Sequence, residues 1–387
     1  MNPSGRRAVL RQACAHCLAL AGVPSWSQQT AWSPPERLPR PSFDSDEGGL
    51  WAMMDQEETR LRRGSFLLRD KGLQDYLTTL VCKLGGAHCP DVRVYAVRTP
   101  LFNALMAPNG MMQVWSGLLL RVSNEAQLAA VLGHELGHYV SRHALARLRE
   151  LRGGSAFATL MVPLGLVGLV GQLAALAGML SYNRDQEREA DSIGVQLAQR
   201  AGYDPRQAAT LWADLRAELS AGAGGDPAKK SVLFASHPGI EDRHATLEAL
   251  TRDATGALGE EDYLRHLAPV LPMLIEDELK RGQYDESIVL FARRSQGRPE
   301  RGDFRYALGE ARRLRGQEGD LAAAEQDLRA ALSLEQPPPA THRSLGLLLR
   351  QLDRRTEAQE AFRRYLQAAP AAADAAMIQS YLNDLTS

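Results

Sequence analysis

The run His134-Glu135-Leu136-Gly137-His138 lies in the middle of a helix that the sequence predicts from about Asn124 to Leu151. The spacing of four residues places both imidazoles on one face of the helix, about one turn apart. Two imidazoles in this arrangement can meet one tetrahedral Zn(II) ion at about 2.0–2.1 Å. Glu135 adjoins the first imidazole and falls beside the open position of the metal, where it can accept a proton from bound water. Histidines on helices are mostly solvated or core residues, but the full motif inside a strongly periodic helix favours a metal site.

A catalytic zinc needs a third protein ligand and leaves a fourth position for water. The sequence offers the charged cluster Asp185-Gln186-Glu187-Arg188-Glu189-Ala190-Asp191. In it, Glu187 and Asp191 are four residues apart and share a helical face. We expect Glu187 to bind the metal and Asp191 to accept a hydrogen bond from the far nitrogen of His134, which fixes the tautomer of that ring. Glu189 is the main competitor by residue type, and a solvated charged face is the alternative interpretation of the cluster.

The expected fold class is mainly α, of the α+β type. Residues 92–97 alternate as a strand, and Met111 to Trp115 is predicted as a second strand after a turn at Pro108-Asn109-Gly110. This pair is the only convincing β structure. A further helix is predicted from about Ser181 to Arg200. We therefore expect residues 49–255 to form a zincin-like metallopeptidase domain with a small β-sheet.

Residues 256–387 change character and become repetitive. Their spacing of small and large apolar residues matches the tetratricopeptide helix pair in one clear copy, Leu345-Gly346, Leu349, Ala358, Phe362 and Pro370. A looser copy and a degraded one precede it, at Leu308-Gly309, Ala324, Leu328 and Ala331, and at Gly282, Tyr284, Ser287 and Phe291. One copy arises easily by chance in Ala/Leu-rich helices, but three in succession favour a C-terminal tetratricopeptide (TPR) α-solenoid.

The N-terminus has the features of an export signal. Arg6 and Arg7 precede a modest apolar run and resemble a twin-arginine signal. We expect residues 1–27 to be this signal peptide and residues 28–48, rich in Pro, Ser and charge, to be a linker. The alternative is a poorly ordered N-terminus.

Two of the four cysteines fall inside the expected signal, and two lie beyond it. Cys82 and Cys89 flank Gly85 and Gly86, and a small disulfide-closed loop is the natural expectation in an exported protein. Two free thiols remain the alternative.

The stretch from Gly153 to Asn183 carries no charged residue. Residues 155–180 are long enough to suggest a membrane span. However, His138 and Glu187 flank the stretch and must touch the same ion, and two spans would need about forty residues. We interpret it as a bent helix or hairpin near the cleft, in contact with the membrane surface, or as an ordinary buried segment.

The overall charge argues against nucleic acid as a partner. The formal net charge is -1, and 24% of the residues are charged. A nucleic-acid-binding protein of this size normally carries a strong excess of Lys and Arg.

The metal motif and its surroundings resemble a known family. The His-Glu-x-x-His run, followed some fifty residues later by Glu-x-x-x-Asp, is similar to the gluzincin peptidases of the HtpX-like and CAAX-prenyl-protease type. With the signal and the repeats added, the chain most resembles the β-barrel assembly-enhancing proteases among them. Further matches are Asn103-Ala104, Pro108-Asn109-Gly110, Val114, Gly117-Leu118-Leu119, and Ser236-His237-Pro238 with Arg243. The family's usual Gly-Gly is Asn109-Gly110 here, and Met106 and Ala107 depart from its usual pattern.

The resemblance implies that His237 lies near the metal. It would donate a hydrogen bond to the reacting oxygen or occupy the open position as a fourth ligand and silence the enzyme, unless it is a plain loop histidine. Arg243, which follows His237 in the sequence, is expected to pair with a carboxylate such as Asp191.

The expected function is that of a zinc-dependent metalloendopeptidase with one Zn(II) per chain. The resemblance implies unfolded or stalled protein substrates, an outer-membrane assembly complex bound through the repeats, and a place in the periplasm of a Gram-negative envelope. The strand Met111 to Trp115 is expected to offer an edge to which a substrate adds as a strand. The alternative function is a latent-protease chaperone or scaffold that binds clients through its repeats.

Overall fold

The computed structural model describes residues 32–151, 182–222, 237 and 240–386. The expected signal peptide and the uncharged stretch 155–180 lie outside the described residues. The elements below all belong to one compact unit, Glu36–Ser387. In the parts of the chain that the structure describes, none of the helices combines the length and the apolar character needed to cross a bilayer.

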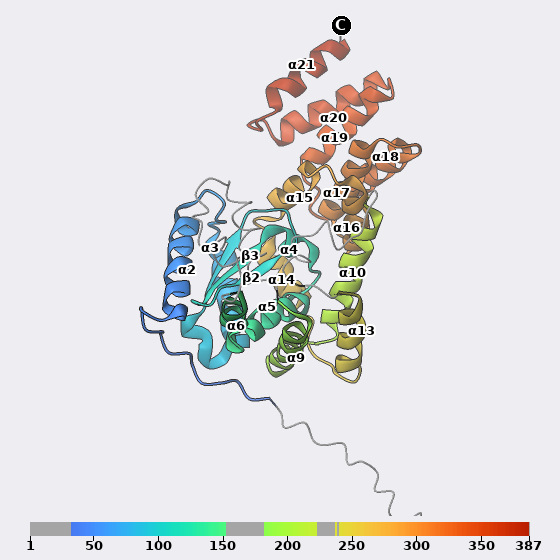
Figure 1. Cartoon of the computed structure of the whole chain (residues 1–387). Helices are drawn as coiled ribbons and strands as arrows, with labels where there is room; N and C mark the ends of the chain where they lie inside the picture. Colours follow the sequence, from blue (N-terminus) through green and yellow to red (C-terminus); the bar gives the residue numbers. More distant parts are fainter. Residues whose placement is uncertain (1–31, 152–181, 223–236, 238–239, 387) are drawn as a thin grey trace, which may run out of the picture. The chain divides into compact units, whose positions relative to one another are not determined.

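A three-stranded mixed sheet lies at the centre of the N-terminal half (Figure 1). The strands are β1 (Arg93–Val97), β2 (Ala104–Met106) and β3 (Met111–Trp115), in the spatial order β1-β3-β2. β3 pairs in parallel with β1 and antiparallel with β2. The two predicted strands are confirmed, whereas the three-residue β2 was missed because it is too short to show a period.

The sheet order corrects the expected substrate edge. β3 was predicted to have a free edge, but it is the central strand and is hydrogen-bonded on both sides. The prediction was wrong because β2, joined to β3 by a tight turn, covers that side. The turn itself lies as predicted: the backbone N–H of Gly110 donates to the carbonyl of Ala107 at 3.0 Å, and Gly110 has φ +89°. A β-carbon at Gly110 would lie 2.0 Å from the carbonyl oxygen of Asp91, so only glycine fits here.

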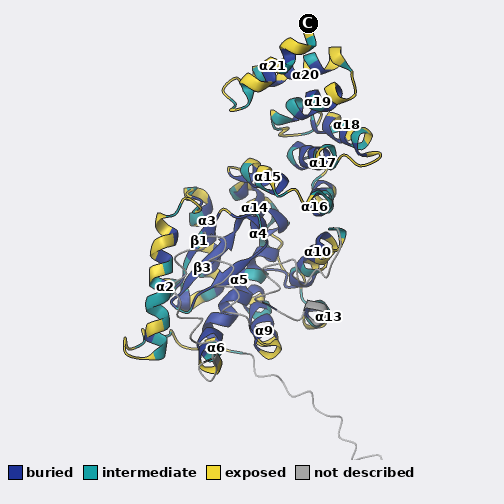
Figure 2. Cartoon of the chain, turned by 45° about the horizontal axis from the view of Figure 1, so that its top comes forward, coloured by how far each residue is buried: buried dark blue, intermediate teal, exposed yellow. Residues whose placement is uncertain are grey.

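Two N-terminal helices cover the sheet, and their apolar spacing explains why. In α3 (Lys71–Gly85), Leu73, Leu77, Leu80 and Leu84 recur at helical spacing and are all buried. α2 (Asp46–Arg63) takes in the last three residues of the expected linker and contributes Met54 and Leu61 to a core that contains Trp115. Burial of each such side chain stabilises the fold by about 1.5–3 kcal/mol. In Figure 2, the strands of the sheet and the neighbouring helix α5 (Glu125–Val140) are coloured mostly as buried.

A disulfide closes the end of α3. Cys82 and Cys89 are joined, with their Cα atoms 4.5 Å apart, and the short helix η1 (Gly86–Asp91) lies between α3 and β1. The geometry is that of the disulfide-closed loop expected from the sequence.

The helix that carries the His-Glu-x-x-His run is shorter than predicted. Asn124 caps α5 (Glu125–Val140), and its side chain accepts from the backbone N–H of Gln127 at 2.9 Å. The predicted single helix to Leu151 is in fact two, because the chain turns at Arg142, which has φ +56°, before α6 (His143–Leu151). A positive φ cannot continue a right-handed helix.

The helix α9 (Arg184–Arg200) packs against α5 along small residues. It begins after Asn183, which forms a capping box with Gln186. A β-carbon at Gly137 would lie 2.9 Å from the carbonyl oxygen of Ala190, and one at Gly194 would lie 2.7 Å from the backbone nitrogen of His134. The glycines thus let the two helices approach closely, which brings their functional side chains together.

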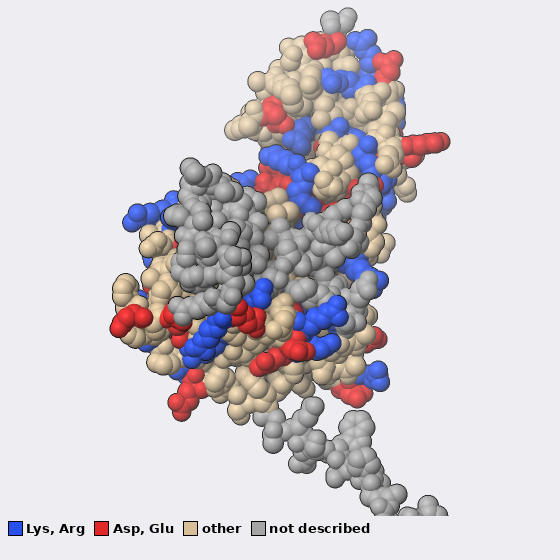
Figure 3. Space-filling model, in the orientation of Figure 1, with Lys and Arg blue, Asp and Glu red and all other residues tan. Residues whose placement is uncertain are grey.

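The remaining helices continue from the sheet to the C-terminus. They are α4 (Ser116–Arg121), α10 (Gln207–Ala221), α13 (Ile240–Thr251), α14 (Glu260–Leu267), α15 (Leu271–Lys280), α16 (Tyr284–Gly297), α17 (Gly302–Arg315), α18 (Asp320–Ala331), α19 (Ala340–Gln351), α20 (Arg355–Ala368) and α21 (Ala375–Thr386). From α15 onward each helix packs against the next. On the face drawn in Figure 3, basic and acidic side chains are interspersed. The chain is therefore mainly helical, with a small mixed sheet.

Candidate metal centre

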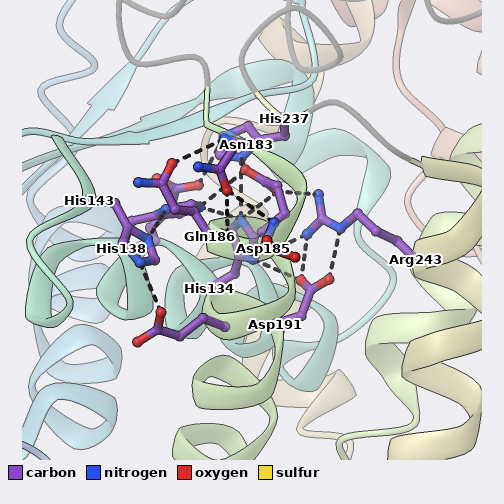
Figure 4. A network of polar contacts seen from close by, with 12 residues as sticks. His134, His138, His143, Asn183, Asp185, Gln186, Asp191, His237 and Arg243 are labelled. Carbon is purple, nitrogen blue, oxygen red and sulfur yellow. Dashed lines mark hydrogen bonds and ion pairs between the residues drawn. The ribbon is translucent and has the colours of Figure 1, made fainter. Parts of the chain in front are cut away.

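Four side chains from three parts of the chain converge on one point. Figure 4 labels the three histidines among them, His134, His138 and His237. His134 and His138 come from α5, Glu187 comes from the first turn of α9, and His237 lies in the connection before α13. Each offers one ligand atom, and these atoms all lie within 4.8 Å of one another. All four side chains are buried.

The spacing of the ligand atoms fits a small tetrahedral ion. Ligands about 2.0–2.1 Å from such an ion lie about 3.4 Å from each other. The two Nε2 atoms of His134 and His138 are 3.0 Å apart, and they lie 3.6 and 3.4 Å from the carboxylate oxygens of Glu187. His237 Nδ1 lies 2.9 Å from Glu187 Oε1 and 3.3 Å from His134 Nε2. The structure thus brings Glu187 close to both rings, and its role as the third ligand stays a prediction.

The electrostatics of the cluster match those of a metal site. Burial lowers the pKa of His138 well below its usual value, so the ring is neutral and can use its lone pair. Burial alone would raise the pKa of Glu187, but the neighbouring His237, His138 and His134 outweigh it and hold the group ionised. Glu187 Oε2 is buried and accepts no hydrogen bond, and its near neighbour is the charged Arg243, with Nη1 3.0 Å away. A neutral imidazole and an ionised carboxylate are the forms that bind zinc.

Asp191 contacts the ring nitrogen of His134 that faces away from the cluster, and Arg243 pairs with Asp191. His134 Nδ1 lies 2.8 Å from Asp191 Oδ1, the contact expected from the sequence. Arg243 donates to the same carboxylate from Nε at 2.9 Å and from Nη2 at 2.5 Å, and its Nη1 lies 3.0 Å from Glu187 Oε2. Burial would raise the pKa of Asp191, but Arg243 and His134 lower it to about 2. The pairing of Arg243 with Asp191 is as predicted.

The ring of His138 is contacted in the same way by His143, which the sequence analysis did not predict. Its Nδ1 lies 2.8 Å from His143 Nδ1, and His143 Nε2 lies 3.3 Å from Glu189 Oε2. Tyr182 stacks on His138 with ring centroids 3.8 Å apart. Glu189, the competing ligand by residue type, is 57% exposed and contacts Ser141 and His143 instead of the cluster. His143 stands five residues after His138, but only the turn between α5 and α6 brings it back to that ring.

Glu135 lies beside the cluster on the side of His237. Its side chain is buried, and its Oε1 lies 3.6 Å from His237 Nε2. A carboxylate beside a metal has the chemistry of a general base, and this role of Glu135 stays a prediction. His237 therefore stands between the two carboxylates of Glu135 and Glu187.

Comparison with known proteins agrees with this chemistry. Residues 67–251, a little under half of the chain, match the model of peptidase family M48. The chain is 34% identical over 154 residues to the mitochondrial metalloendopeptidase OMA1 of Arabidopsis thaliana, 40% of this chain and 30% of that protein. It is 34% identical over 171 residues to the beta-barrel assembly-enhancing protease of Yersinia pestis, 40% of this chain and 35% of that protein. The Escherichia coli (strain K12) protein of the same name is 33% identical over 176 residues, 41% of this chain and 36% of its own length. The chain thus spans about a third of these relatives.

Proposed function

Because residues 67–251 match the model of peptidase family M48, we propose that this chain is a zinc-dependent metalloendopeptidase. The observation that carries the proposal is the convergence of His134, His138 and Glu187 on one point, with Glu135 beside it. The named similarity to metalloendopeptidases and to beta-barrel assembly-enhancing proteases supports it.

The reaction is the hydrolysis of a peptide bond. Bound zinc would polarise the scissile carbonyl and make the attacking water more acidic. Glu135 accepts the proton of that water and delivers it to the leaving amine. Asp191 and His143 each hold one imidazole ring in the orientation and tautomer that a ligand needs. Arg243 keeps Asp191 ionised for this task.

The substrate adds as a strand to β2, in place of the edge first expected at β3. Asn103 and Ala107 hydrogen-bond to β3 through their backbones, so the alternate residues Ala104 and Met106 turn their backbone groups away from it. In the described part of the chain no strand pairs with this outer side. α5, which carries the cluster, packs against β2. An extended peptide here would be bound by its backbone, which suits unfolded or misassembled proteins.

The resting enzyme is latent. In support, the ligand atom of His237 lies within 4.8 Å of those of His134, His138 and Glu187, so that the ring could take the fourth position that water needs. Displacement of His237 would open that position. The second candidate function is a chaperone or scaffold whose peptidase is silent, and the similarity to metalloendopeptidases does not favour it.

The C-terminal helices serve as TPR-type repeats that dock a client or an outer-membrane assembly complex. Successive helices from α15 to α21 pack in sequence, and a β-carbon at Gly346 would lie 2.5 Å from the ring of Phe362, a close small-to-large contact between paired helices. With an export signal at residues 1–27, the chain works in the periplasm, where the disulfide is stable.

Zinc content tests the site directly. Purified wild type is expected to hold one zinc per chain, and Glu187→Ala is expected to hold little. Casein hydrolysis then tests the reaction: wild type, in which His237 is displaced only part of the time, has low activity, Glu135→Gln is inactive with its zinc retained, and His237→Ala is more active than wild type. Absence of cleavage from both wild type and His237→Ala, with zinc bound, would favour the scaffold.

A further inference from the structure

A segment that the sequence predicts as linker is packed beside the metal centre. This segment, residues 36–45, is called the strap here, and in Figure 1 it is the blue coil that leads into α2. Leu38 of the strap lines a cavity of about 300 Å³, and so does the ring of His138, one of the four side chains of the metal centre. Glu47, in the first turn of α2, lines the same cavity. The strap therefore lies on the His138 side of the centre.

An ion pair and a tight turn hold the strap at its two ends. Arg37 donates to both carboxylate oxygens of Asp91, from Nε at 2.8 Å and from Nη2 at 2.5 Å. At the other end, the backbone N–H of Ser45 donates to the carbonyl oxygen of Ser42 at 3.1 Å. A β-carbon at Gly48 would lie 2.1 Å from that carbonyl oxygen, so the turn packs directly on α2. Leu38 is thus positioned between two fixed points.

The contacts that hold the strap are of a kind that is easily released. The side chain of Arg37 is 54% exposed, and water and salt screen such a pair. The pair between Arg40 and Asp55, with nitrogen and oxygen 3.3 Å apart, is exposed as well. Pro39 and Pro41 restrict the backbone of the displaced segment, so that docking it again loses less entropy. The strap is therefore suited to an equilibrium between a docked and a displaced state.

The cavity lined by Leu38 lies at one end of the proposed substrate edge. Its wall includes Met106, the last residue of β2, and Ala107 and Pro108 of the turn that follows. A peptide that adds to the outer side of β2 and continues past Met106 enters this region. Leu38 and such a peptide then compete for the same space.

The strap can occupy this place without being a good substrate. An extended substrate is bound through its backbone N–H and C=O groups, and proline has no backbone N–H. Pro39 and Pro41 are two residues apart, so in a strand their missing N–H groups fall on the same side. The strap therefore lacks two successive donors on that side, which opposes its binding as a regular strand.

We propose that residues 36–45 form an autoinhibitory strap, in which Arg37 on Asp91 anchors Leu38 where it keeps peptides away from the His138 side of the β2 edge. A substrate must displace the strap to bind along the whole edge. This inference rests on the proposed peptidase function. It is separate from the proposed role of His237, which lines a different cavity together with Glu135.

The double change Arg37→Ala, Leu38→Ala tests the strap by kinetics. The strap competes with substrate and does not touch the reacting atoms, so its release is expected to lower KM for a quenched fluorescent peptide by at least about fivefold and to leave kcat within about twofold. Zinc content should stay at the wild-type level. The control Arg60→Ala, Leu314→Ala removes an arginine from another exposed pair and an exposed leucine from α17, and should keep the wild-type KM. An unchanged KM in the strap variant would overturn the proposal.

Peptide binding gives a measurement that needs no turnover. In metal-loaded Glu135→Gln, the same double change is expected to tighten the binding of a fluorescent unfolded peptide by at least about fivefold. A synthetic peptide with the sequence of residues 33–45 should displace the fluorescent peptide from this variant, whereas the same peptide with Leu38→Asp should not. Unchanged affinity, or equal displacement by both synthetic peptides, would contradict the strap. Tighter binding after release of the strap, with no peptide cleavage by any protein that retains Glu135, would instead contradict the proposed peptidase function.

Discussion

At the scale of single residues, the site depends on side chains that orient the ligands. His134 is held by Asp191 at 2.8 Å, and His138 is held by His143 at the same distance. His143 in turn contacts Glu189, whose carboxylate is largely exposed. The two imidazoles are thus oriented by different groups. The Asp191–Arg243 ion pair contacts His134, and the ring of His143 contacts His138. Loss of such a contact frees the ring to rotate away from the ion.

We expect His143→Ala to weaken zinc binding by about 10- to 100-fold, because His138 loses the group that fixes its ring. Competition with a chromogenic chelator measures the dissociation constant directly. His143→Gln, which keeps a polar atom near His138 Nδ1, should recover part of the loss. His342→Ala, at a half-buried position on α19, is the control and should leave the affinity unchanged. An unaltered dissociation constant in His143→Ala would assign His143 a packing role only.

At the scale of elements, the distance between α5 and α9 positions the cluster. Two ligands stand on α5 and one on α9, and glycines at the contact allow the helices to approach closely. Gly137 belongs to the motif itself, and its α-hydrogen faces the backbone of Ala190. A side chain at this position would meet backbone atoms, which cannot move aside as a flexible side chain can.

Gly137→Ala is expected to destabilise the fold by about 1–3 kcal/mol, the usual cost of overpacking a rigid contact. It should also weaken zinc binding, because α9 and Glu187 move away from His134 and His138. Gly49→Ala in α2 is the matched control: a β-carbon there meets nothing within 4 Å, so it should be neutral or stabilise by up to about 1 kcal/mol. Urea unfolding of the metal-free proteins separates the packing effect from metal binding.

The attachment of α2 to the sheet depends on a carboxylate. Glu58 accepts hydrogen bonds from Arg93 at 2.7 and 2.6 Å and from the hydroxyl of Tyr95 at 2.7 Å. Burial would raise the pKa of Glu58, but these hydrogen bonds and the charge of Arg93 outweigh it and lower the pKa below 4.5. A carboxylate whose pKa is lowered by folding stabilises the protein above its unfolded pKa, and this contribution is lost as the pH falls through the folded pKa.

Glu58→Gln is therefore expected to lower the free energy of unfolding by about 1.5–3 kcal/mol at pH 7, the range for hydrogen bonds to a charged group. The difference from wild type should shrink as the pH falls below 4.5. Denaturant titrations at several pH values measure this trend. Glu57→Gln, on the same helix and in a surface pair with Arg60, should cost no more than about 1 kcal/mol. A difference that stays constant down to low pH would exclude ionisation of Glu58 as the cause.

At the scale of the whole compact unit, buried charges join the sheet region to the C-terminal helices. Arg121 at the end of α4 donates to Glu218 of α10 at 2.7 Å and to both oxygens of Glu278 of α15 at 3.0 Å. Arg293 of α16 donates to the other oxygen of Glu218 at 2.7 Å. Arg121, Glu218 and Glu278 are buried, and the two carboxylates raise the pKa of Arg121 against the effect of burial.

Arg121→Met is expected to destabilise the protein by about 3–5 kcal/mol, because it leaves two carboxylates buried without their main partner. Limited proteolysis should then cut between the sheet region and the α16–α21 helices faster than in wild type. The triple change Arg121→Met, Glu218→Leu and Glu278→Met should recover part of the loss, because no carboxylate is then left buried without Arg121. Arg293 loses Glu218 in this variant but keeps Asp214 at 3.5 Å. Arg364→Met, which removes one partner of an exposed pair on α20, is the control and should behave as wild type. Equal stability of Arg121→Met and wild type would contradict a coupling through this network.

Much of the metal cluster was predictable from local spacing. The positions of His134 and His138 on one face, the cap at Asn124 and the shared face of Glu187 and Asp191 follow from helical periodicity, which depends on neighbours within about four residues. The turn at Gly110 was predictable for the same reason, because its Asn-Gly pair favours a tight turn.

The rest depended on contacts between distant residues. The three residues of β2 are too few to show a period, so the central place of β3 was decided only when β2 paired with it. The turn at Arg142 brings His143 back to His138, and the close approach of α5 and α9 leaves an apolar cavity beside Glu135. Strand order, ring-to-ring contacts and cavities arise from packing across the chain, and no local pattern of residues encodes them.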